Sequence, residues 1–157
     1  MLPDNLRDRT AAAAVEAFDS GALTGGKFDR GELTLEIAPA RIVPVCGFLK
    51  HDRGFARLST VTAVDRYPAE PRFEVVYHLH SIEHNERVRL KCGLSGENPE
   101  IPSVTSVWRS ADWYEREVFD LFGIRFAGHP DLRRIMLPDD WEGHPLRKDY
   151  PITGSRV

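Results

Sequence analysis

His129 and His144 each lie in a Gly-His-Pro triplet, and they are the residues of this chain best suited to metal chemistry. Asp131 and Asp149 follow them closely, so two imidazoles and two carboxylates could together hold a metal ion. Zinc signatures usually bring their ligands close on one helix or knuckle, whereas these four residues lie in predicted loops. We therefore favour turns in which both imidazoles bond to backbone or carboxylate groups, and we expect no metal site.

A dense mixture of Arg, Asp and Glu after Trp108 offers groups for acid-base chemistry. Helical spacing places Glu117 and Asp120 at the edge of an apolar stripe, where a carboxylate needs a partner. The stripe consists of Tyr114, Val118, Leu121 and Phe122, with Trp113 beside it. The candidate partners are the arginines downstream, Arg125, Arg133 and Arg134, because a guanidinium binds a carboxylate with two hydrogen bonds. An ion-pair network that braces a loop is favoured over catalysis.

Motifs of other catalytic and cofactor-binding classes are missing. No Ser lies in a Gly-x-Ser-x-Gly elbow, and there is neither a Gly-x-Gly-x-x-Gly run nor a Gly-rich phosphate loop. Cys46 and Cys92 lie far apart without Cys-x-x-Cys spacing. The chain therefore cannot by itself supply the four thiolates of an ordinary iron–sulfur cluster, and we expect reduced, packed thiols.

Charge and hydropathy exclude two further classes of partner. The net charge is −3, and Lys and Arg alternate with acids rather than forming a stripe, so we expect no nucleic-acid binding. The N-terminus lacks a basic start followed by an apolar run, and no window is apolar for long enough to span a bilayer. Any membrane contact is expected to come through a partner.

Helices and strands that could position these groups alternate along the first part of the chain. We predict a helix over residues 3–18, capped by Asp4 or Asn5 and ending near Gly21. Its apolar face would contain Leu6, Thr10, Ala14 and Phe18. After a Gly-rich turn, alternation over residues 33–37 predicts a strand, and residues 41–50 predict a helix with Pro44 in its first turn.

Three more strands are predicted over residues 56–65, 72–81 and 86–92, the last two joined by a turn near His84 and Asn85. One face of these strands is apolar, and the other carries polar and charged side chains. We expect an α+β fold of two layers, in which helices cover one face of a mostly antiparallel sheet.

The pattern of residue types changes after Gly93. Ser103 could cap a short helix over residues 103–108, and Ser110 could cap a longer helix that runs through Phe122 and stops at Gly123. Prolines at 138, 145 and 151, without apolar periodicity, predict an extended tail. We therefore divide the chain into an α+β domain, residues 1–123, and an extended partner-binding arm, residues 124–157. Aromatic residues and Arg are frequent interface anchors, so partner binding is the leading inference.

The run SVWRSADWYEREVFDLFGIRFAGHPDLRRIMLPDDWEGHPLRKDYP, residues 106–151, closely resembles the NuoC or 30 kDa subunit family of bacterial NADH-quinone oxidoreductase, respiratory complex I. LSTVTAVD at residues 58–65 extends the resemblance more loosely upstream. The resemblance implies a cofactor-free structural subunit of the peripheral arm, while FMN, the iron–sulfur clusters and quinone belong to partner subunits. It also implies docking chiefly on the D subunit of the complex, near the quinone module. The complex as a whole transfers electrons from NADH to quinone and translocates protons.

The resemblance further implies a peripheral position on the cytoplasmic side of the bacterial inner membrane, or on the matrix side in mitochondria. Our hypothesis is that Glu117, Asp120 and two arginines brace the turn after the last helix, and that residues 138–151 lie over a neighbouring subunit. The residues assigned to bracing or partner contact are Trp113, Glu115, Glu117, Asp120, Phe122, Gly123, Gly128, His129, Pro130, Asp131, Arg133, Arg134, Trp141, Gly143, His144, Pro145, Arg147, Lys148, Asp149 and Tyr150.

Two alternatives stay open. Related NDH complexes and membrane-bound hydrogenases contain subunits of this family, with the same docking role but other electron donors and acceptors. A free-standing metalloenzyme that uses His129, His144, Asp131 and Asp149 belongs to a different class, and the metal content of the isolated chain would distinguish it from a scaffold.

Overall fold

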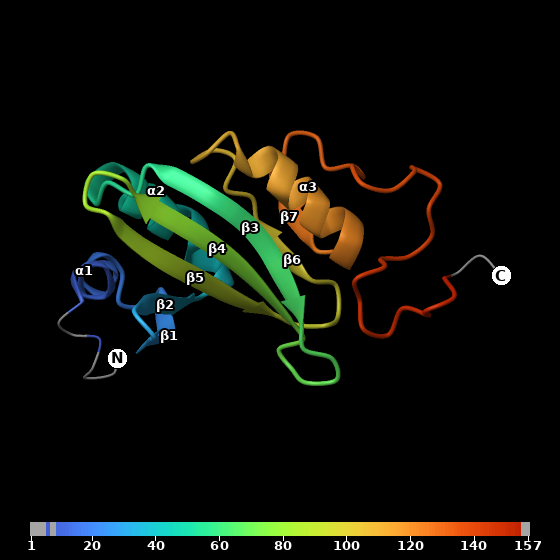
Figure 1. The fold of residues 1–157 in the computed structure, drawn as a ribbon, viewed down its shortest axis with the longest axis horizontal. Coiled ribbons are helices and arrows are strands. Elements are labelled where there is room, and N and C mark those ends of the chain that lie inside the picture. The colour runs from blue at the N-terminus through green and yellow to red at the C-terminus, as the bar shows by residue number, and fades with distance from the viewer. Residues whose placement is uncertain (1–5, 7–8, 155–157) are drawn as a thin grey trace.

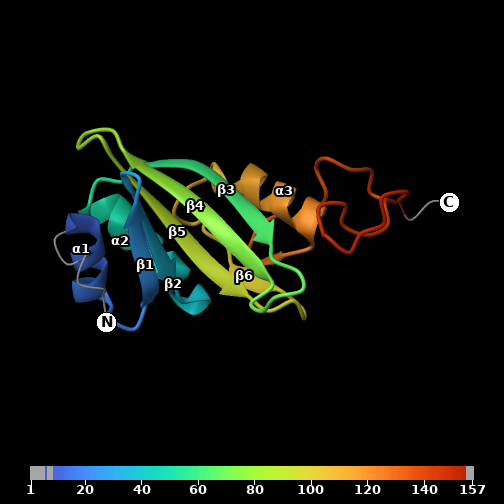
Figure 2. The same ribbon diagram turned by 60° about the horizontal axis from the view of Figure 1, so that its bottom comes forward.

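The computed structural model describes residue 6 and residues 9–154, which form a five-stranded sheet with helices on one face (Figure 1). The strands lie in the order β1-β2-β5-β4-β3. Their bounds are β1 Leu23–Asp29, β2 Glu32–Ile37, β3 Arg57–Asp65, β4 Phe73–Ser81 and β5 Glu86–Leu94. Figure 2 shows these strands in front, with helices α2 (Ile42–Asp52) and α3 (Ala111–Phe122) behind them. The predicted α+β class is confirmed.

Strands β3, β4 and β5 form where the alternation of apolar and polar residues predicts them. In β4, Phe73, Val75 and Tyr77 are fully buried and face the helices, whereas His78 is only partly buried on the outer face. His78 lies opposite Arg89 of β5 in the antiparallel pair β4–β5. One face of the sheet is thus the core and the other is polar, because side chains alternate along each strand.

Two features of the sheet differ from the prediction. The Gly-rich segment before β2 is not a turn but the edge strand β1, because its backbone pairs with β2. Glycines suit this position, since a Cβ on Gly26 would lie 2.8 Å from the carbonyl oxygen of Thr34. The sheet is also mixed, because β2 pairs with β5 in parallel. A helix and two strands separate β2 from β5, so the chain returns to β2 running in the same direction.

The first helix is shorter than predicted and buries a different face. The helix predicted over residues 3–18 is observed as α1 (Thr10–Phe18), and its proposed caps lie outside the described residues. The buried residues of α1 are Ala11, Ala12 and Val15, not the predicted Thr10, Ala14 and Phe18. Small side chains allow a close approach to the core, while Phe18 is 46% exposed and stacks on Phe48 at 4.4 Å. Leu6 is buried as predicted.

The second helix, α2, follows a single 3-10 turn, η2 (Pro39–Arg41), and contains Pro44 in its first turn as predicted. Its buried residues are Ile42, Val45, Cys46 and Leu49. Cys46 and Cys92 are both buried free thiols, which confirms the expectation of packed, reduced cysteines. Within the described residues, no helix is both long and apolar enough to cross a bilayer.

Helix α3 begins after Ser110 and ends at Gly123, as predicted, although the Ser110 side chain makes no capping hydrogen bond. Gly123 ends the helix in a left-handed conformation, φ 73°, and its N–H donates to the carbonyl of Phe119. The short helix predicted over residues 103–108 is wrong. The Ser103 hydroxyl bonds to Glu115 at 2.6 Å instead of capping a helix, and the segment forms an irregular turn.

A second, two-stranded sheet joins the segments on either side of α3. Strands β6 (Glu100–Pro102) and β7 (Arg125–Ala127) pair in parallel, with Ile101 opposite Phe126. Both of these side chains are buried, and so is Ile124. The core therefore continues past residue 123, where the sequence places the end of the domain.

Residues 128–154, hereafter the C-terminal segment, contain no helix or strand in the part of the chain that is described. Figure 1 shows this segment leaving β7, running beside α3 and then turning beyond the end of that helix. The predicted absence of regular structure is confirmed, but the segment is a series of turns rather than an extended tail. Side-chain contacts must therefore hold it in place.

Candidate partner-binding surface

Asp120 on α3 is the main anchor of the C-terminal segment. Its side chain is fully buried, and Oδ1 accepts a hydrogen bond from Arg134 Nη1 at 2.7 Å. Oδ2 accepts the backbone N–H groups of Ile135, Met136 and Leu137 at 3.1, 2.7 and 2.9 Å. Burial acts to raise the pKa of Asp120, but Arg134 and the three amides outweigh it and hold the pKa below the usual range. One carboxylate thus fixes four consecutive residues.

Arg134 extends the same network across the segment. Its Nη2 donates to the carbonyl oxygens of Trp141 at 3.0 Å and Gly143 at 2.9 Å. Arg116 of α3, which is also buried, donates to the carbonyls of Arg133 at 3.2 Å and Arg134 at 3.1 Å. The backbone of this segment lacks a sheet or helix partner, so these guanidinium groups take over part of its hydrogen bonding.

The last carbonyls of α3, which have no partner inside a helix, bind the second Gly-His-Pro turn. His144 Nδ1 donates to the carbonyl of Asp120 at 2.9 Å, and the N–H of Leu146 donates to that of Leu121 at 3.0 Å. Arg147 Nε donates to the carbonyl of Phe122 at 2.6 Å. The C-terminal segment therefore caps the end of α3.

Gly123 permits this close approach. A Cβ at this position would lie 2.7 Å from both His144 Nε2 and Arg147 Nη2, and its φ of 73° also favours glycine. Burial, with a smaller contribution from nearby arginines, lowers the pKa of His144 despite its bond to the Asp120 carbonyl. A neutral imidazole is consistent with its role as a donor to that carbonyl.

The first Gly-His-Pro turn is tied to the opposite end of α3. The His129 side chain is fully buried, and Nε2 lies 3.2 Å from both the carbonyl and the Oδ1 atom of Asp112. Its Nδ1 accepts the N–H of Asp131 at 3.0 Å, so Nε2 carries the proton. The two histidines thus serve different ends of one helix, and no group of three or more potential ligands for a metal ion occurs among the described residues.

A third anchor joins the C-terminal segment to the loop between β3 and β4. Arg72 binds Asp65 with two hydrogen bonds of 3.0 and 2.9 Å and reaches Asp149 at 2.6 Å. Asp65 also accepts the N–H of Lys148 at 2.9 Å. Hydrogen bonds from Arg72 hold the pKa of Asp65 well below its usual range, against the effect of burial. Neither Asp65 nor Arg72 is predicted as a site residue from sequence, because Asp149 is 77 residues from Arg72.

The ion-pair prediction is confirmed for Asp120 and Arg134 and wrong for the other arginines. Arg133 pairs with Asp131 at 2.8 Å and Arg125 lies 3.6 Å from Glu100, all on exposed side chains. Glu117 is exposed, and within the described chain no ion pair joins it to any of these arginines. Asp120 is buried rather than at the edge of the helix face, because the C-terminal segment covers it.

Glu115 points the other way, into the core. It is fully buried, and its carboxyl group bonds to the Ser103 hydroxyl at 2.6 Å and to the N–H of Val104 at 2.8 Å. Burial raises the pKa of Glu115 to about 7, although both hydrogen bonds oppose the rise. Glu115 therefore holds the turn before α3 rather than a partner surface.

The remaining assigned residues of the C-terminal segment differ in exposure. Gly143 has a φ of 80°, and a Cβ there would lie 2.9 Å from the ring of Tyr150. Pro130 and Lys148 are exposed, whereas Trp141 and Pro145 are partly buried. Gly128 has a φ of 82° in the first turn.

Exposed apolar side chains gather on α3 and the C-terminal segment. Five of the eight large, exposed hydrophobic residues found in the described chain lie there: Trp113, Ile135, Met136, Leu146 and Ile152. Trp113 is 60% exposed, with Arg116 at 5.3 Å from its ring, and Met136 is 64% exposed. An ordered segment that presents apolar side chains to solvent is typical of a protein–protein contact.

Sequence relatives of this chain are respiratory subunits. The family described as "Respiratory-chain NADH dehydrogenase, 30 Kd subunit" matches residues 35–156. The C subunit of NADH-quinone oxidoreductase from Roseiflexus castenholzii is 47% identical over 97% of this chain and 88% of its own length. The corresponding protein of Geobacter sulfurreducens is 47% identical over 94% and 91%. That of Salinispora tropica is 49% identical over 96% of this chain, which spans 63% of that longer relative.

Two solved structures share the fold. A trypsin-resistant fragment of Nqo5 superposes with a TM-score of 0.67 and 32% identity, covering 76% of this chain and 97% of the fragment. A chain of the membrane-bound sulfane sulfur reductase, an archaeal respiratory membrane complex, has a TM-score of 0.71 and 28% identity, covering 89% and 83%. The shared fold and the length and identity of the sequence matches agree: this chain belongs to the 30 kDa subunit family of respiratory-chain NADH dehydrogenase.

Proposed function

We propose that this chain is the NuoC-type, 30 kDa subunit of an NADH-quinone oxidoreductase, respiratory complex I, and that it serves as a structural subunit of the peripheral arm. It binds no FMN, iron–sulfur cluster or quinone of its own. The complex transfers electrons from NADH to quinone and translocates protons, and this chain contributes by holding neighbouring subunits. Its chief neighbour is the D subunit of the complex, close to the quinone module.

The anchored C-terminal segment is the observation that carries this proposal. Asp120, Arg134 and Arg147 hold a segment without regular structure in one conformation, while Met136 and Leu146 remain exposed. Preformed order lowers the entropy cost of association, so the segment is suited to contact a partner. The family membership supports another subunit of a respiratory complex as that partner.

The names of the relatives also support a proposal for the position of this chain in the cell. Its relatives are named as subunits of respiratory oxidoreductases, and one solved relative is part of a respiratory membrane complex. We propose that the chain lies on the cytoplasmic side of the inner membrane, or on the matrix side in mitochondria, and reaches the membrane only through its partners.

A related complex with another electron donor or acceptor is the second candidate. The similarity to a chain of an archaeal sulfane sulfur reductase favours it, because that structure shows the same fold in a different respiratory complex. NDH complexes and membrane-bound hydrogenases belong to the same group of candidates. The free-standing metalloenzyme receives no support, because His129 and His144 bind opposite ends of α3.

The test is a tagged pull-down of the full chain from detergent-solubilised membranes, with the eluate assayed for NADH-quinone reductase activity and for iron. We expect a large, iron-rich, active assembly. Replacing Met136 or Leu146 with Asp should reduce recovery of that assembly, because each would place a charge in the apolar contact. Ile82→Asp is the matched control, since Ile82 is 67% exposed at the tip of the β4–β5 hairpin. Recovery of a lone, metal-bearing chain would refute the proposal.

A further inference from the structure

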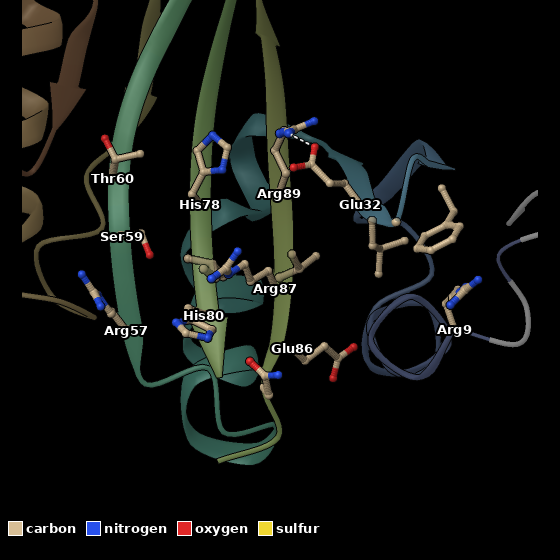
Figure 3. A pocket seen from close by; sticks show the side chains of 16 residues that line it. Arg9, Glu32, Arg57, Ser59, Thr60, His78, His80, Glu86, Arg87 and Arg89 are labelled. Carbon is tan, nitrogen blue, oxygen red and sulfur yellow. Dashed lines mark hydrogen bonds and ion pairs between the residues drawn. The ribbon is translucent and has the colours of Figure 1, made fainter. Parts of the chain in front are cut away.

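The outer face of the main sheet, remote from the C-terminal segment, carries a hollow of about 940 Å³ (Figure 3). Four arginines and two glutamates line it: Arg9, Arg57, Arg87, Arg89, Glu32 and Glu86. Hereafter this is the basic hollow. Its excess of positive charge is unusual for a chain whose net charge is −3, and it therefore points to an anionic partner.

Cross-strand pairing arranges the basic hollow in two rows. Arg57 of β3 pairs with His80 of β4, which pairs in turn with Arg87 of β5. Figure 3 shows these three side chains projecting from neighbouring strands on one face. Directly opposed residues have Cβ atoms roughly 5 Å apart, so two guanidinium stems flank one imidazole. The two guanidinium groups therefore lie on one small area of the sheet, where their charges favour an anion.

That anion is not supplied by the described part of this chain. The second row consists of Thr60, His78 and Arg89, and Arg89 forms an ion pair with Glu32. Arg57 and Arg87 are exposed, and neither forms an ion pair with any described residue. His80 Nε2 is buried and has no hydrogen-bond partner within the same described residues. Its hydrogen-bonding capacity is therefore unused within the described residues.

His78 adds hydrogen-bonding capacity rather than charge. Burial, assisted by nearby Arg89, lowers the pKa of His78, while Glu32 opposes the shift. His78 therefore stays neutral at pH 7, and the positive charge comes from the arginines. The hydroxyl-bearing residues Ser59 and Thr60 complete the floor.

We propose that the basic hollow is a second docking surface of this protein, which binds an acidic segment of a partner protein through at least two Asp or Glu carboxylates. Strand spacing places the backbones of Arg57 and Arg87 roughly 10 Å apart, which suits two carboxylates better than one small anion. The glutamates and the shortage of aromatic residues in the hollow disfavour nucleic acid, whose binding relies on phosphate contacts and base stacking.

Carbodiimide cross-linking in the purified, assembled complex tests this proposal. Arg57→Lys and Arg87→Lys keep the charge but introduce a primary amine, which condenses with a carboxylate in contact to form an amide with loss of water. We expect mass spectrometry to find cross-links from position 57 or 87 to Asp or Glu of another subunit. Arg109→Lys is the matched control, because Arg109 is exposed and lies before α3, outside the basic hollow. Cross-links confined to Glu32 or Glu86 of the same chain would overturn the proposal.

Charge reversal gives an independent measurement. The double variant Arg57→Glu, Arg87→Glu should reduce incorporation of the chain into the complex by roughly tenfold or more, because like charges would then oppose each other. Arg109→Glu should leave incorporation unchanged, and thermal melting of each isolated variant verifies that the fold is intact. Unchanged incorporation of the double variant would overturn this proposal alone, while an effect of Met136→Asp would still support docking through the C-terminal segment.

A small anion is distinguished by titrating the isolated chain with inorganic phosphate and following the amide signals of His78 and His80. We expect no saturable change at millimolar phosphate. Saturable changes confined to the basic hollow would assign it to a small anion and would likewise refute a protein partner.

Discussion

Replacing Asp120 with Asn should release the start of the C-terminal segment while leaving the core folded. The substitution keeps the shape of the side chain but removes its charge and one acceptor oxygen. The single amide oxygen can still accept the N–H groups of Ile135, Met136 and Leu137, which Oδ2 accepts now at 2.7–3.1 Å. The NH₂ group then faces Arg134 Nη1, which now lies 2.7 Å from Oδ1, so two donors oppose each other.

The cost can be worked from these contacts. Loss of the charge-assisted bond to Arg134 costs about 1.5–3 kcal/mol, and the three amide bonds weaken because their acceptor becomes neutral. We expect a total of about 3 kcal/mol for local opening, or roughly 150-fold at about 1.36 kcal/mol per factor of ten.

This opening can be measured directly by NMR on the full chain, as the hydrogen-exchange rates of the amides of residues 135–137. Exchange should accelerate by that factor in Asp120→Asn, while amides of β4 keep their protection. Asp131→Asn is the matched control, because Asp131 pairs with Arg133 on exposed side chains. Equal exchange in the two variants would refute the reasoning.

The stabilisation by Asp120 also depends on pH. Because the folded pKa of Asp120 is lowered, its contribution to stability is complete above the ordinary value of 3.8 and is lost as pH falls through the folded pKa.

Three further predictions concern other anchors. Glu115 has a folded pKa of about 7 against an ordinary 4.5, so its contribution to stability should be complete below 4.5 and decrease by about 3 kcal/mol as pH rises to 7. Chemical denaturation at several pH values should show this slope, and Glu115→Gln should abolish it; a slope that persists in the variant would assign it to another group. Gly123→Ala should cost at least about 1–2 kcal/mol from its φ of 73° and displace the imidazole of His144. Loss of the His144 contact would appear as a ring-signal shift by NMR, and an unshifted ring would contradict the close approach. Arg134→Ala should cost about 3–5 kcal/mol locally, because it leaves a buried carboxylate unpaired, and should weaken assembly on native gels. Arg133→Ala should leave assembly intact, and equal loss in both arginine variants would show that the pairing geometry does not matter.

Local sequence patterns were sufficient for most helices and strands. Alternation of apolar and polar residues located β3, β4 and β5, and Gly123 located the end of α3, because both signals depend on neighbouring residues alone. Ser103 shows where such local signals fail. Its hydroxyl could cap a helix or bond elsewhere, and a buried carboxylate twelve residues later decided the outcome.

The sequence predicted the general character of the site, but not which of its residues pair. The residue types after Trp108 indicated buried ion pairs and partner contact, and the long run of residues indicated the family. The pairing of Asp120 with Arg134 rather than with another arginine depended on how the C-terminal segment folds back. Likewise, edge strand β1 and the parallel pair β2–β5 depended on backbone hydrogen bonds between segments far apart in the chain.

The class of fold and the position of most elements were thus determined by apolar periodicity, helix-capping residues and glycines at helix ends, since these signals are properties of short stretches of chain. Tertiary structure alone decided which charges meet. Arg72 and Asp149 are 77 residues apart, and each row of the basic hollow contains residues of three different strands. The energy of such a contact depends on burial and geometry that arise only when distant segments pack together.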